Sequence, residues 1–465
     1  MKKIYFIFFI PIILFSYETL WVRIFDQGAK EALSAICFDN QDNILITGGI
    51  WRGMRRKWNI LFIKYTPNGE LIWTREYDSG QSESAICIGM DREGNIIIGG
   101  VSGDDTIEAQ YLVAKFSPEG NLIWRRDFRS GDLSSFFDLF IDENNNILLC
   151  GGSYWYAGGG QSVASLFKYD ANGNLLWYRF YDWASWFYRI LPLPDSSFLI
   201  LGDVLDTTAN SLNWRIFIVK FNLNGHPMWI KKYIGRNRCD YWAAGLALDQ
   251  FGNIIVGGYE LGRRNNYDNY DILLLKFTAT GDTMWSKRLD FTSFDYIMDI
   301  EIDETGNIYA AGGVGKIDTF DYLLIKFNSE GETIWTTRYD NNDKNDEIGD
   351  LIIDRENNII VTGTSRRYDL SDYDGLTIKY RGTEGINENF KQPFSFDTRF
   401  KINKLKQQYL ILPNYVEKIE IYDVNGKLIK EDKGYKISLK GIKSGIYFLK
   451  VIAQQKLYIK KLIII

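Results

Sequence analysis

The fold of this chain is decided by residues 71–116, which hold four short β-rich runs: LIWTREYD (71–78), SAICIGMD (84–91), NIIIGG (95–100) and YLVAKF (111–116). The order recurs along the chain, since a tryptophan returns every 50 to 56 residues, at Trp21, Trp73, Trp124, Trp177, Trp229, Trp285 and Trp335. Four short strands separated by turn residues are typical of one blade of a β-propeller. The sequence therefore predicts an all-β fold, a seven-bladed β-propeller with four-stranded blades.

A five-residue turn between the second and third runs begins with Asp and ends with Asn in six of the repeats. Its fourth residue is Gly, Asn or Asp, the types that adopt a left-handed backbone, and the leading Asp is expected to accept hydrogen bonds from turn amides. A calcium loop needs a denser set of oxygen ligands, so no metal or cofactor is expected. The fourth repeat has PDSS (194–197), and a shorter turn is expected there.

The repeated tryptophans are interpreted as packing residues. A glycine precedes six of them by four residues, which is typical of a tight hairpin leading into the last strand of a blade. A large flat ring at the start of that strand can fill the wedge between neighbouring blades. We therefore expect these tryptophans in the core rather than in a binding site.

The two ends of the repeat region indicate how the ring closes. The chain opens with a Trp strand, LWVRIF (20–25), and the repeats end at LTIKY (376–380) with no Trp strand after it. The N-terminal strand is therefore expected to complete the last blade, which removes the open sheet edges. These units resemble the seven-bladed β-propeller repeat family of exported bacterial proteins, over roughly residues 20–381.

Residues 1–17 have the pattern of a signal peptide. Two lysines precede an apolar run from Ile4 to Phe15, which is shorter than the roughly 20 residues of a membrane-spanning helix. The alternative is a buried first strand. The expected organisation is a signal peptide (1–17), the propeller (18–382), a linker (383–392) and a small β-sandwich (393–465), with no integral membrane segment in the mature protein.

The C-terminal segment contains YDVNGKLI (422–429), LKGIKSGIYFLKV (439–451) and KKLIII (460–465). This order resembles the C-terminal sorting domain of the type IX secretion system. The resemblance implies secretion, or a place on the cell surface of a bacterium with an outer membrane, and contact with the secretion machinery. It also implies that these residues form an address: Tyr422, Asp423, Gly426, Lys427, Gly445, Tyr447, Lys450 and Lys461. The alternative is an accessory β-sandwich that stabilises the propeller.

Charge and composition exclude several functions. Residues 383–465 hold 16 Lys and Arg against 8 Asp and Glu, a net charge of +8, and residues 1–17 carry +2. Because the net charge of the whole chain is −5, residues 18–382 carry −15. An acidic body argues against a nucleic-acid partner, because phosphate binding needs concentrated positive charge. His226 is the only histidine, so a Ser-His-Asp triad has one possible base and a multi-histidine metal site has no ligands.

The longer connections between the runs are rich in tryptophan, tyrosine and arginine, the residue types that anchor interfaces and stack on sugar faces. All of them are expected on one variable face, as on other rigid scaffolds whose loops recognise ligands. The candidate ligand-binding residues are Trp51, Arg52, Arg55, Trp58, Trp155, Tyr156, Trp186, Trp214, Arg238, Trp242, Arg263, Tyr267, Arg366 and Tyr368. The alternative for any one of them is that it covers a blade edge.

Three functions compete on this basis. The favoured one is a non-enzymatic binding or adhesion propeller that recognises a polysaccharide or a surface protein. The second is a structural surface-layer protein, and the third is an extracellular polysaccharide lyase or hydrolase. An enzyme would draw its carboxylates from Asp203, Asp206, Asp268, Asp271, Asp318, Asp321, Asp369, Asp372 and Asp374. Acids in such places are usually turn caps, and no catalytic pair stands out, so no catalytic residue is assigned.

Overall fold

The computed structural model divides the chain into two compact units, Met1–Glu384 and Gly385–Ile465. The structure describes residues 18–382 except 54–56, 104–108, 157–159, 207–212, 236–238, 265–266, 317–318, 342–344 and 367–372. It also describes residues 400–464 except 403–408, 412–415, 424–426, 434–435, 439–441, 443–444 and 454–455. The expected signal peptide (1–17) and linker (383–392) lie outside these residues.

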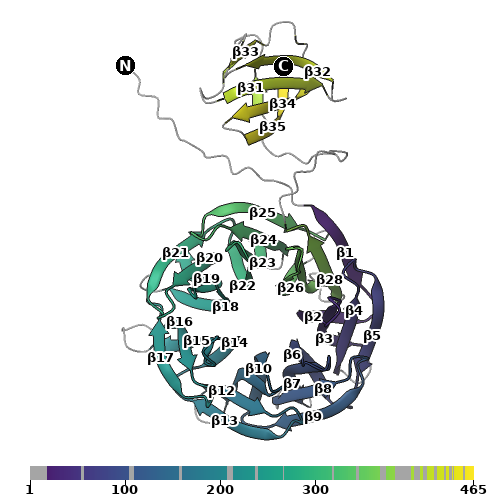
Figure 1. The fold of residues 1–465 in the computed structure, drawn as a ribbon, viewed down its shortest axis with the longest axis vertical. Helices are drawn as coiled ribbons and strands as arrows, with labels where there is room; N and C mark the ends of the chain where they lie inside the picture. The colour runs from purple at the N-terminus through teal and green to yellow at the C-terminus, as the bar shows by residue number, and fades with distance from the viewer. Residues whose placement is uncertain are drawn as a thin grey trace. The chain divides into compact units, whose positions relative to one another are not determined.

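The N-terminal unit is built from 28 strands that follow one another around a ring (Figure 1). The first fourteen are β1 (Thr19–Phe25), β2 (Lys30–Phe38), β3 (Ile44–Trp51), β4 (Trp58–Tyr65), β5 (Leu71–Tyr77), β6 (Ser82–Met90), β7 (Ile96–Gly103), β8 (Ala109–Phe116), β9 (Leu122–Phe128), β10 (Leu133–Ile141), β11 (Ile147–Trp155), β12 (Gln161–Tyr169), β13 (Leu175–Tyr181) and β14 (Trp186–Pro192). The others are β15 (Phe198–Asp206), β16 (Asn213–Phe221), β17 (Pro227–Lys232), β18 (Asp240–Leu248), β19 (Ile254–Arg264), β20 (Tyr267–Phe277), β21 (Thr283–Leu289), β22 (Phe294–Ile302), β23 (Ile308–Lys316), β24 (Thr319–Phe327), β25 (Thr333–Tyr339), β26 (Asn345–Ile353), β27 (Ile359–Arg366) and β28 (Tyr373–Tyr380).

Successive strands pair antiparallel in sets of four, such as β2-β3-β4-β5 and β14-β15-β16-β17. The innermost strand of each set lies nearest the centre of the ring and the outermost forms its rim (Figure 1). The two middle strands are buried along most of their length, because both faces pack against neighbouring sheets. Their continuous apolar runs, such as ILITGGI (44–50), follow from this double burial, whereas the innermost strand β2 alternates between more and less buried positions.

The Asp-led turns have the predicted conformation. The fourth residue has a positive φ in each, for example 61° at Asp42, 83° at Gly94 and 58° at Asn145. The Asp39 carboxylate accepts hydrogen bonds from the amides of Gln41 and Asn43, both at 2.8 Å. In at least five of the six motifs a lysine from the third strand of the blade pairs with the leading Asp, as Lys64 Nζ does at 2.8 Å from Asp39.

The expectation of a shorter turn in the fourth repeat is wrong. Leu193 takes the place of the leading Asp, since its amide donates to the Ser197 carbonyl at 2.8 Å and the Ser196 amide donates back to Leu193 at 3.1 Å. The turn therefore keeps five residues, with a positive φ of 63° at Ser196. The carboxylate has moved two positions along, because Asp195 pairs with Lys220 at 2.7 Å.

The repeated glycines are held by the tryptophan of the preceding blade. At Gly173, where φ is 75°, a Cβ atom would lie 2.8 Å from the Trp124 ring, so a side chain is excluded by contact as well as by conformation. The Trp124 indole donates to the Ala171 carbonyl at 3.3 Å, and Arg126 lies over its ring. Each such contact fixes the angle between two neighbouring blades.

The first strand of this unit pairs with the last one. Strand β1 lies antiparallel to β28, from Thr19 opposite Tyr380 to Phe25 opposite Gly375. Beyond the pair, the Arg381 amide donates to the Glu18 carbonyl at 2.9 Å. Chain segments more than 350 residues apart thus share one sheet with β26 and β27.

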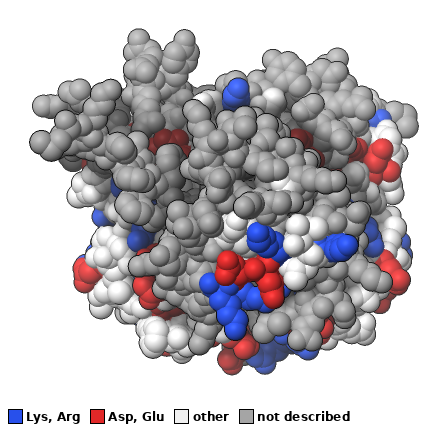
Figure 2. All heavy atoms as spheres, turned by 90° about the horizontal axis from the view of Figure 1, so that it is seen from above, with Lys and Arg blue, Asp and Glu red and all other residues white. Residues whose placement is uncertain are grey.

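The C-terminal unit contains a five-stranded sheet and a two-stranded sheet. Its strands are β29 (Phe400–Ile402), β30 (Tyr409–Ile411), β31 (Val416–Asp423), β32 (Leu428–Lys433), β33 (Lys436–Ser438), β34 (Gly445–Ala453) and β35 (Lys456–Ile464). Lys418 and Lys450 both pair with Glu420, at 2.6 and 3.0 Å. Figure 2 shows one face of the whole molecule, on which Lys and Arg are intermixed with Asp and Glu among the coloured residues rather than separated by sign.

Every regular element among the described residues is a β-strand. No helix in this part of the chain is long and apolar enough to cross a membrane.

Candidate functional site: a pocket in the central channel

The middle of each innermost strand carries a β-bulge. The register shifts between Leu33 and Ala35 in β2 and between Phe136 and Asp138 in β10, and the other innermost strands shift at the equivalent place. A bulge leaves one residue outside the ladder and re-aims its side chain. The bulged residues line a pocket of about 490 Å³ in the channel: Ser34, Ile86, Phe137, Tyr188, Ala244, Met298 and Gly349.

The pocket lies in the half of the channel from which the longer connections leave. Its lining includes Trp242 and Glu347, each the third residue of an innermost strand, together with Tyr259 in the middle of β19 and Thr364 two residues before the end of β27. Beyond Tyr259 and Thr364, β19 and β27 lead into the connections between the second and third strands of a blade. The Asp-led turns leave the opposite ends of the same strands.

Aromatic side chains form two walls of the pocket. On one wall the Trp242 and Tyr259 rings stack, with centroids 5.4 Å apart and planes 21° from parallel. On the other, Phe137 contacts Tyr188 with centroids 5.6 Å apart. The Tyr188 hydroxyl donates to Asp203 at 2.8 Å, which fixes the ring. The walls therefore offer flat apolar faces held in place by their neighbours.

The floor of the pocket is charged. Arg189, directly after the bulge of β14, reaches the innermost strand two blades further on, where its Nη2 lies 3.4 Å from Asp299 Oδ1 and donates to the Met298 carbonyl at 3.3 Å. The fifth blade lies between them and has Gly245 at this position, where a Cβ atom would lie 2.7 Å from the Ile300 amide nitrogen. The missing side chain lets the innermost strands approach this closely.

Three carboxylates after the bulges each bind the backbone of the next blade. Each accepts a hydrogen bond of 2.9 to 3.1 Å from a backbone amide of the next blade. The donor is the residue that directly follows the position equivalent to the acid. The pairs are Asp138 with Ile190, Asp299 with Leu351, and Asp350 with Ile36. These acids join blades beneath Arg189, the charged residue of the group that lines the pocket itself.

Several acids in and behind the floor are protonated more readily than usual. Burial raises the pKa of Asp138 to about 6, although Arg189 opposes the shift, and burial with the nearby Asp299 raises the pKa of Glu301 to about 8. Burial raises the pKa of Asp203 to about 7 against the Tyr188 hydrogen bond, while burial and then Asp299 raise the pKa of Asp350. A single guanidinium does not hold all of these groups in the charged form at neutral pH.

We expect the stability of the N-terminal unit to fall as the pH rises from 4.5 to 8.5. The unfolded chain releases these protons near pH 4, whereas the folded chain keeps them to pH 6–8, so folding is favoured at the acidic end. The total should be a few kcal/mol, since one pKa unit corresponds to about 1.4 kcal/mol. Urea unfolding in EDTA measures it, and Asp203→Asn should flatten the slope. Stability that rises throughout this range would contradict the assignment.

The structure places the candidate ligand-binding residues in several separate groups, and the pocket receives one of them. Trp242 lines the pocket. Trp51 and Trp58 face each other across the β3–β4 hairpin, and Trp58 packs on Tyr373. Trp155 packs on Phe180.

The other candidates are also spread over the ring. Trp186 contacts Phe137, and Trp214 is the second residue of β16. Tyr156 is 55% exposed beside Tyr154. Arg52 and Arg366 pair with Glu76 and Glu347. Arg55, Arg238 and Tyr368 lie outside the described residues, as do the side chains of Arg263 and Tyr267.

The expectation that the acids near these connections are turn caps is wrong for three of them. Asp203, Asp321 and Asp374 lie within β15, β24 and β28 and are buried. His226, the one possible triad base, lies in the β16–β17 turn, where its Nε2 is 3.4 Å from Arg179 Nη2. It belongs to the face opposite the pocket.

Sequence reasoning missed the floor of the pocket. Arg189, Asp138, Asp299 and Asp350 lie inside apolar runs that looked like core strands. A signal was present, because these four positions are equivalent in the repeats and the other three repeats have Ala35, Cys87 and Gly245 there. Charged residues at one aligned position of an apolar run indicate a common polar surface.

The sorting residues belong to three strands of the C-terminal unit. Tyr422 and Asp423 are in β31, Gly445, Tyr447 and Lys450 in β34, and Lys461 in β35, with Asp423 opposite Tyr447. Lys427 lies just before β32, and Gly426 is outside the described residues. The sequence landmarks thus converge on adjacent strands of one sheet.

Comparison with known proteins separates the two parts of the chain. Residues 399–465 match the family model of the secretion system C-terminal sorting domain. An uncharacterized WD repeat-containing protein of Acanthamoeba polyphaga mimivirus is 20% identical over 54% of this chain and 26% of its own length, so the chain spans about a quarter of that relative.

Solved structures resemble the N-terminal unit in fold. An ulvan lyase of a new polysaccharide lyase family, bound to a GlcA–Rha3S segment, aligns with a TM-score of 0.50 at 12% identity, covering 77% of this chain and 96% of the lyase. A protein of unknown function from Dyadobacter fermentans aligns with a TM-score of 0.45 at 10% identity, covering 80% and 100%. The chain is therefore an exported all-β repeat protein of the propeller type, secreted or held at the surface of a bacterium with an outer membrane, and its residues 399–465 match the secretion system C-terminal sorting domain.

Proposed function

We propose that this protein is a seven-bladed β-propeller, closed by the pairing of β1 with β28, that binds a polysaccharide without turning it over. The observation that carries the proposal is the channel pocket, whose walls present the Trp242–Tyr259 stack and the Phe137–Tyr188 pair. Flat aromatic faces suit the apolar faces of sugar rings, and concave sites with a few polar groups are typical of ligand pockets.

The polar groups at this pocket fit a hydroxyl-rich ligand. The Arg189 guanidinium on the floor offers donors, and Glu347, which pairs with Arg366, places a carboxylate at the rim. A carboxylated or sulfated sugar would meet Arg189 as a charge partner. The likeness to an ulvan lyase solved with a GlcA–Rha3S segment supports the propeller fold as a carrier of such a site.

The proposed organisation is a signal peptide (1–17), the propeller (18–382), a linker (383–392) and a C-terminal sorting domain (393–465). In this arrangement the second unit directs export and the first recognises the ligand. The residues in β31, β34 and β35 that match the sorting pattern would contact the secretion machinery. Two ligand-binding candidates outside the pocket, Trp51 and Trp58, would extend the site along the variable face.

Binding of the full chain to an array of bacterial and plant polysaccharides tests this function. We expect saturable binding by the wild type and at least tenfold weaker binding by Trp242→Ala, because a buried aromatic anchor contributes over 1 kcal/mol. Trp155→Ala is the matched control, since Trp155 packs on Phe180 away from the pocket. Thermal unfolding of each variant checks that it is folded.

Other outcomes would assign a different function. Loss of binding in Trp155→Ala alone would place the site on the connections rather than in the channel. Cleavage of the polysaccharide in the same samples would identify an enzyme. Asp203, which has a raised pKa and lies beside Tyr188, would then be the first acid to substitute. Absence of glycan binding with ordered self-association would favour a structural surface-layer protein.

A further inference from the structure

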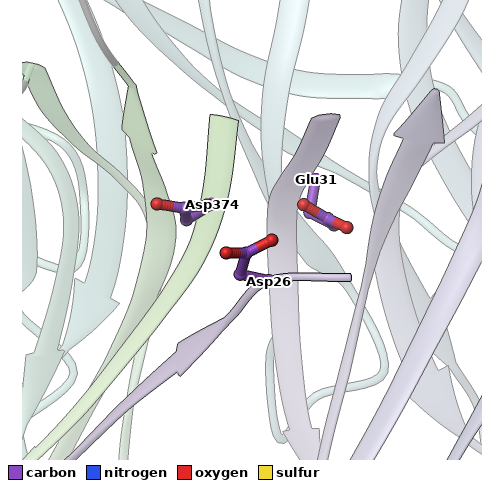
Figure 3. A group of neighbouring side chains, drawn as sticks. All are labelled: Asp26, Glu31 and Asp374. Carbon is purple, nitrogen blue, oxygen red and sulfur yellow. The ribbon is translucent and has the colours of Figure 1, made fainter. Parts of the chain in front are cut away.

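Three carboxylates meet where the last blade joins the first. Asp26 follows β1, Glu31 is the second residue of β2, and Asp374 is the second residue of β28 (Figure 3). One carboxylate oxygen from each lies within 4.8 Å of the others, and Glu31 and Asp374 are buried. Glu31 and Asp374 thus lie in strands, and Asp26 lies in the connection from β1 to β2.

Glu31 is aimed into this group without enough donors of its own. It is 0% exposed, and Oε1 accepts a hydrogen bond from the Gln27 amide at 3.1 Å. Its other oxygen, Oε2, is buried and has no hydrogen-bond partner among the described residues. Burying a carboxylate oxygen without a hydrogen bond destabilises the folded state, and a bound cation or a proton on this oxygen would remove that cost.

The equivalent acids at two other blade junctions have a cation or more donors. Glu83, which is equivalent to Glu31, pairs through Oε1 with Arg125 at 2.7 Å, while its buried Oε2 has no hydrogen-bond partner among the described residues. Asp295 accepts from the amides of Phe291 and Thr292 at 2.6 and 2.7 Å, and from the Thr292 hydroxyl. Each of these acids has donors for both oxygens or a guanidinium.

The junction between the last two blades has the same three acids and carries its own cation. Asp321, Asp340 and Asp346 form the second cluster of this kind, and Arg338 pairs with Asp321. Arg338 lies opposite Leu323 in β24, and the equivalent residue opposite Leu376 in β28 is Ile24. Ile24 is 50% exposed and brings no charge, so among the described residues this position has no counterpart to Arg338.

Two positive side chains near the first cluster, Arg52 and Lys30, are already engaged. Arg52 pairs with Glu76 at 2.8 Å, and its Nη2 donates to the Gln27 side-chain oxygen at 3.0 Å. Lys30 lies over the rings of Trp51 and Tyr373, at 5.1 and 4.9 Å. Burial raises the pKa of Glu31 to about 7, the Gln27 amide opposes this, and Asp26 and Asp374 raise it further.

We propose that Asp26, Glu31 and Asp374 bind a calcium ion, which joins the connection after β1 to β2 and β28. Carboxylate oxygens are the ligands that this hard cation prefers, and water would complete its coordination. Sites of millimolar affinity are useful outside the cell, where an exported protein works. The ion would stabilise the junction at which the two ends of the N-terminal unit meet, independently of any glycan in the channel.

Calorimetric titration of the full chain with CaCl₂, after removal of metals with EDTA, tests the proposal. We expect one Ca²⁺ per chain, tighter than Mg²⁺, and a melting temperature several degrees higher with Ca²⁺ than in EDTA. Glu31→Gln keeps the acceptor for the Gln27 amide but should weaken Ca²⁺ binding at least tenfold. Absence of Ca²⁺ binding by the wild type, or unchanged binding by Glu31→Gln, would overturn the site.

Two exchanges between the equivalent junctions give matched controls. Ile24→Arg supplies the internal cation, so it should remove Ca²⁺ binding while keeping the melting temperature in EDTA at or above the wild-type value. Arg338→Ile should create a second site at Asp321, Asp340 and Asp346, giving two Ca²⁺ per chain. If Ile24→Arg still binds Ca²⁺ like the wild type, or Arg338→Ile gains no ion, the charge argument is wrong.

Discussion

Replacing Arg189 with methionine is expected to destabilise the N-terminal unit by about 3 kcal/mol or more at pH 8, because it leaves a group of acids on the channel floor without their guanidinium. Asp299 would lose its ion pair, and Asp138 and Asp350 would lose the charge that favours their ionised forms. Methionine keeps much of the side-chain volume, so packing contributes little to the loss.

The pH dependence separates charge from packing in this variant. Without Arg189 the pKa values of Asp138 and Asp350 should rise further, so the variant should regain stability at pH 5, where protonation removes the repulsion. Urea unfolding at pH 5 and pH 8 measures both values. The triple change Arg189→Met, Asp299→Asn and Asp350→Asn is the control, since neutral amides still accept the hydrogen bonds from Leu351 and Ile36. An equal loss at both pH values would contradict the electrostatic role of Arg189.

Deletion of residues 18–25 is the second change with a large expected effect. It removes β1, and with it the Trp21 ring that covers Gly69 and all backbone partners that β1 gives to β28. We expect a melting temperature at least 10 °C lower, and association between molecules, because the exposed edge of β28 can pair with another chain. Calorimetry and sedimentation measure the two effects.

A permuted chain gives the matched rescue. Glu18 and Arg381 are adjacent, since the Arg381 amide donates to the Glu18 carbonyl at 2.9 Å. Moving residues 18–25 to follow Arg381 through a short turn should therefore restore β1 against β28 and recover the melting temperature of the wild type. Removal of Gly385–Ile465 is the control for truncation as such. A deleted chain as stable as the wild type would show that β1 has no part in holding the ring together.

Sequence alone predicted the features that depend on neighbouring residues. The four-strand repeat and the left-handed residue in each Asp-led turn follow from short spacings, such as the five residues from Asp91 to Asn95. The expectation that the repeated tryptophans lie in the core holds only for Trp335, because the other six are half-buried. The C-terminal landmarks were equally local and led to the sorting domain that the family comparison confirms. Local backbone chemistry is the same in every repeat, so one well-formed unit stands for the others.

Only the tertiary structure decided which repeats meet across the channel and what charge each junction contains. The reach of Arg189 to Asp299 depends on Gly245 in the blade between them, and the missing cation beside Glu31 depends on Ile24 standing where another junction has Arg338. Such contacts join residues 50 to 350 positions apart, and a one-dimensional repeat does not encode their distances. The sequence determined the blade and the export signal, whereas ring geometry determined the site, because a ring brings equivalent positions of different repeats together at its centre.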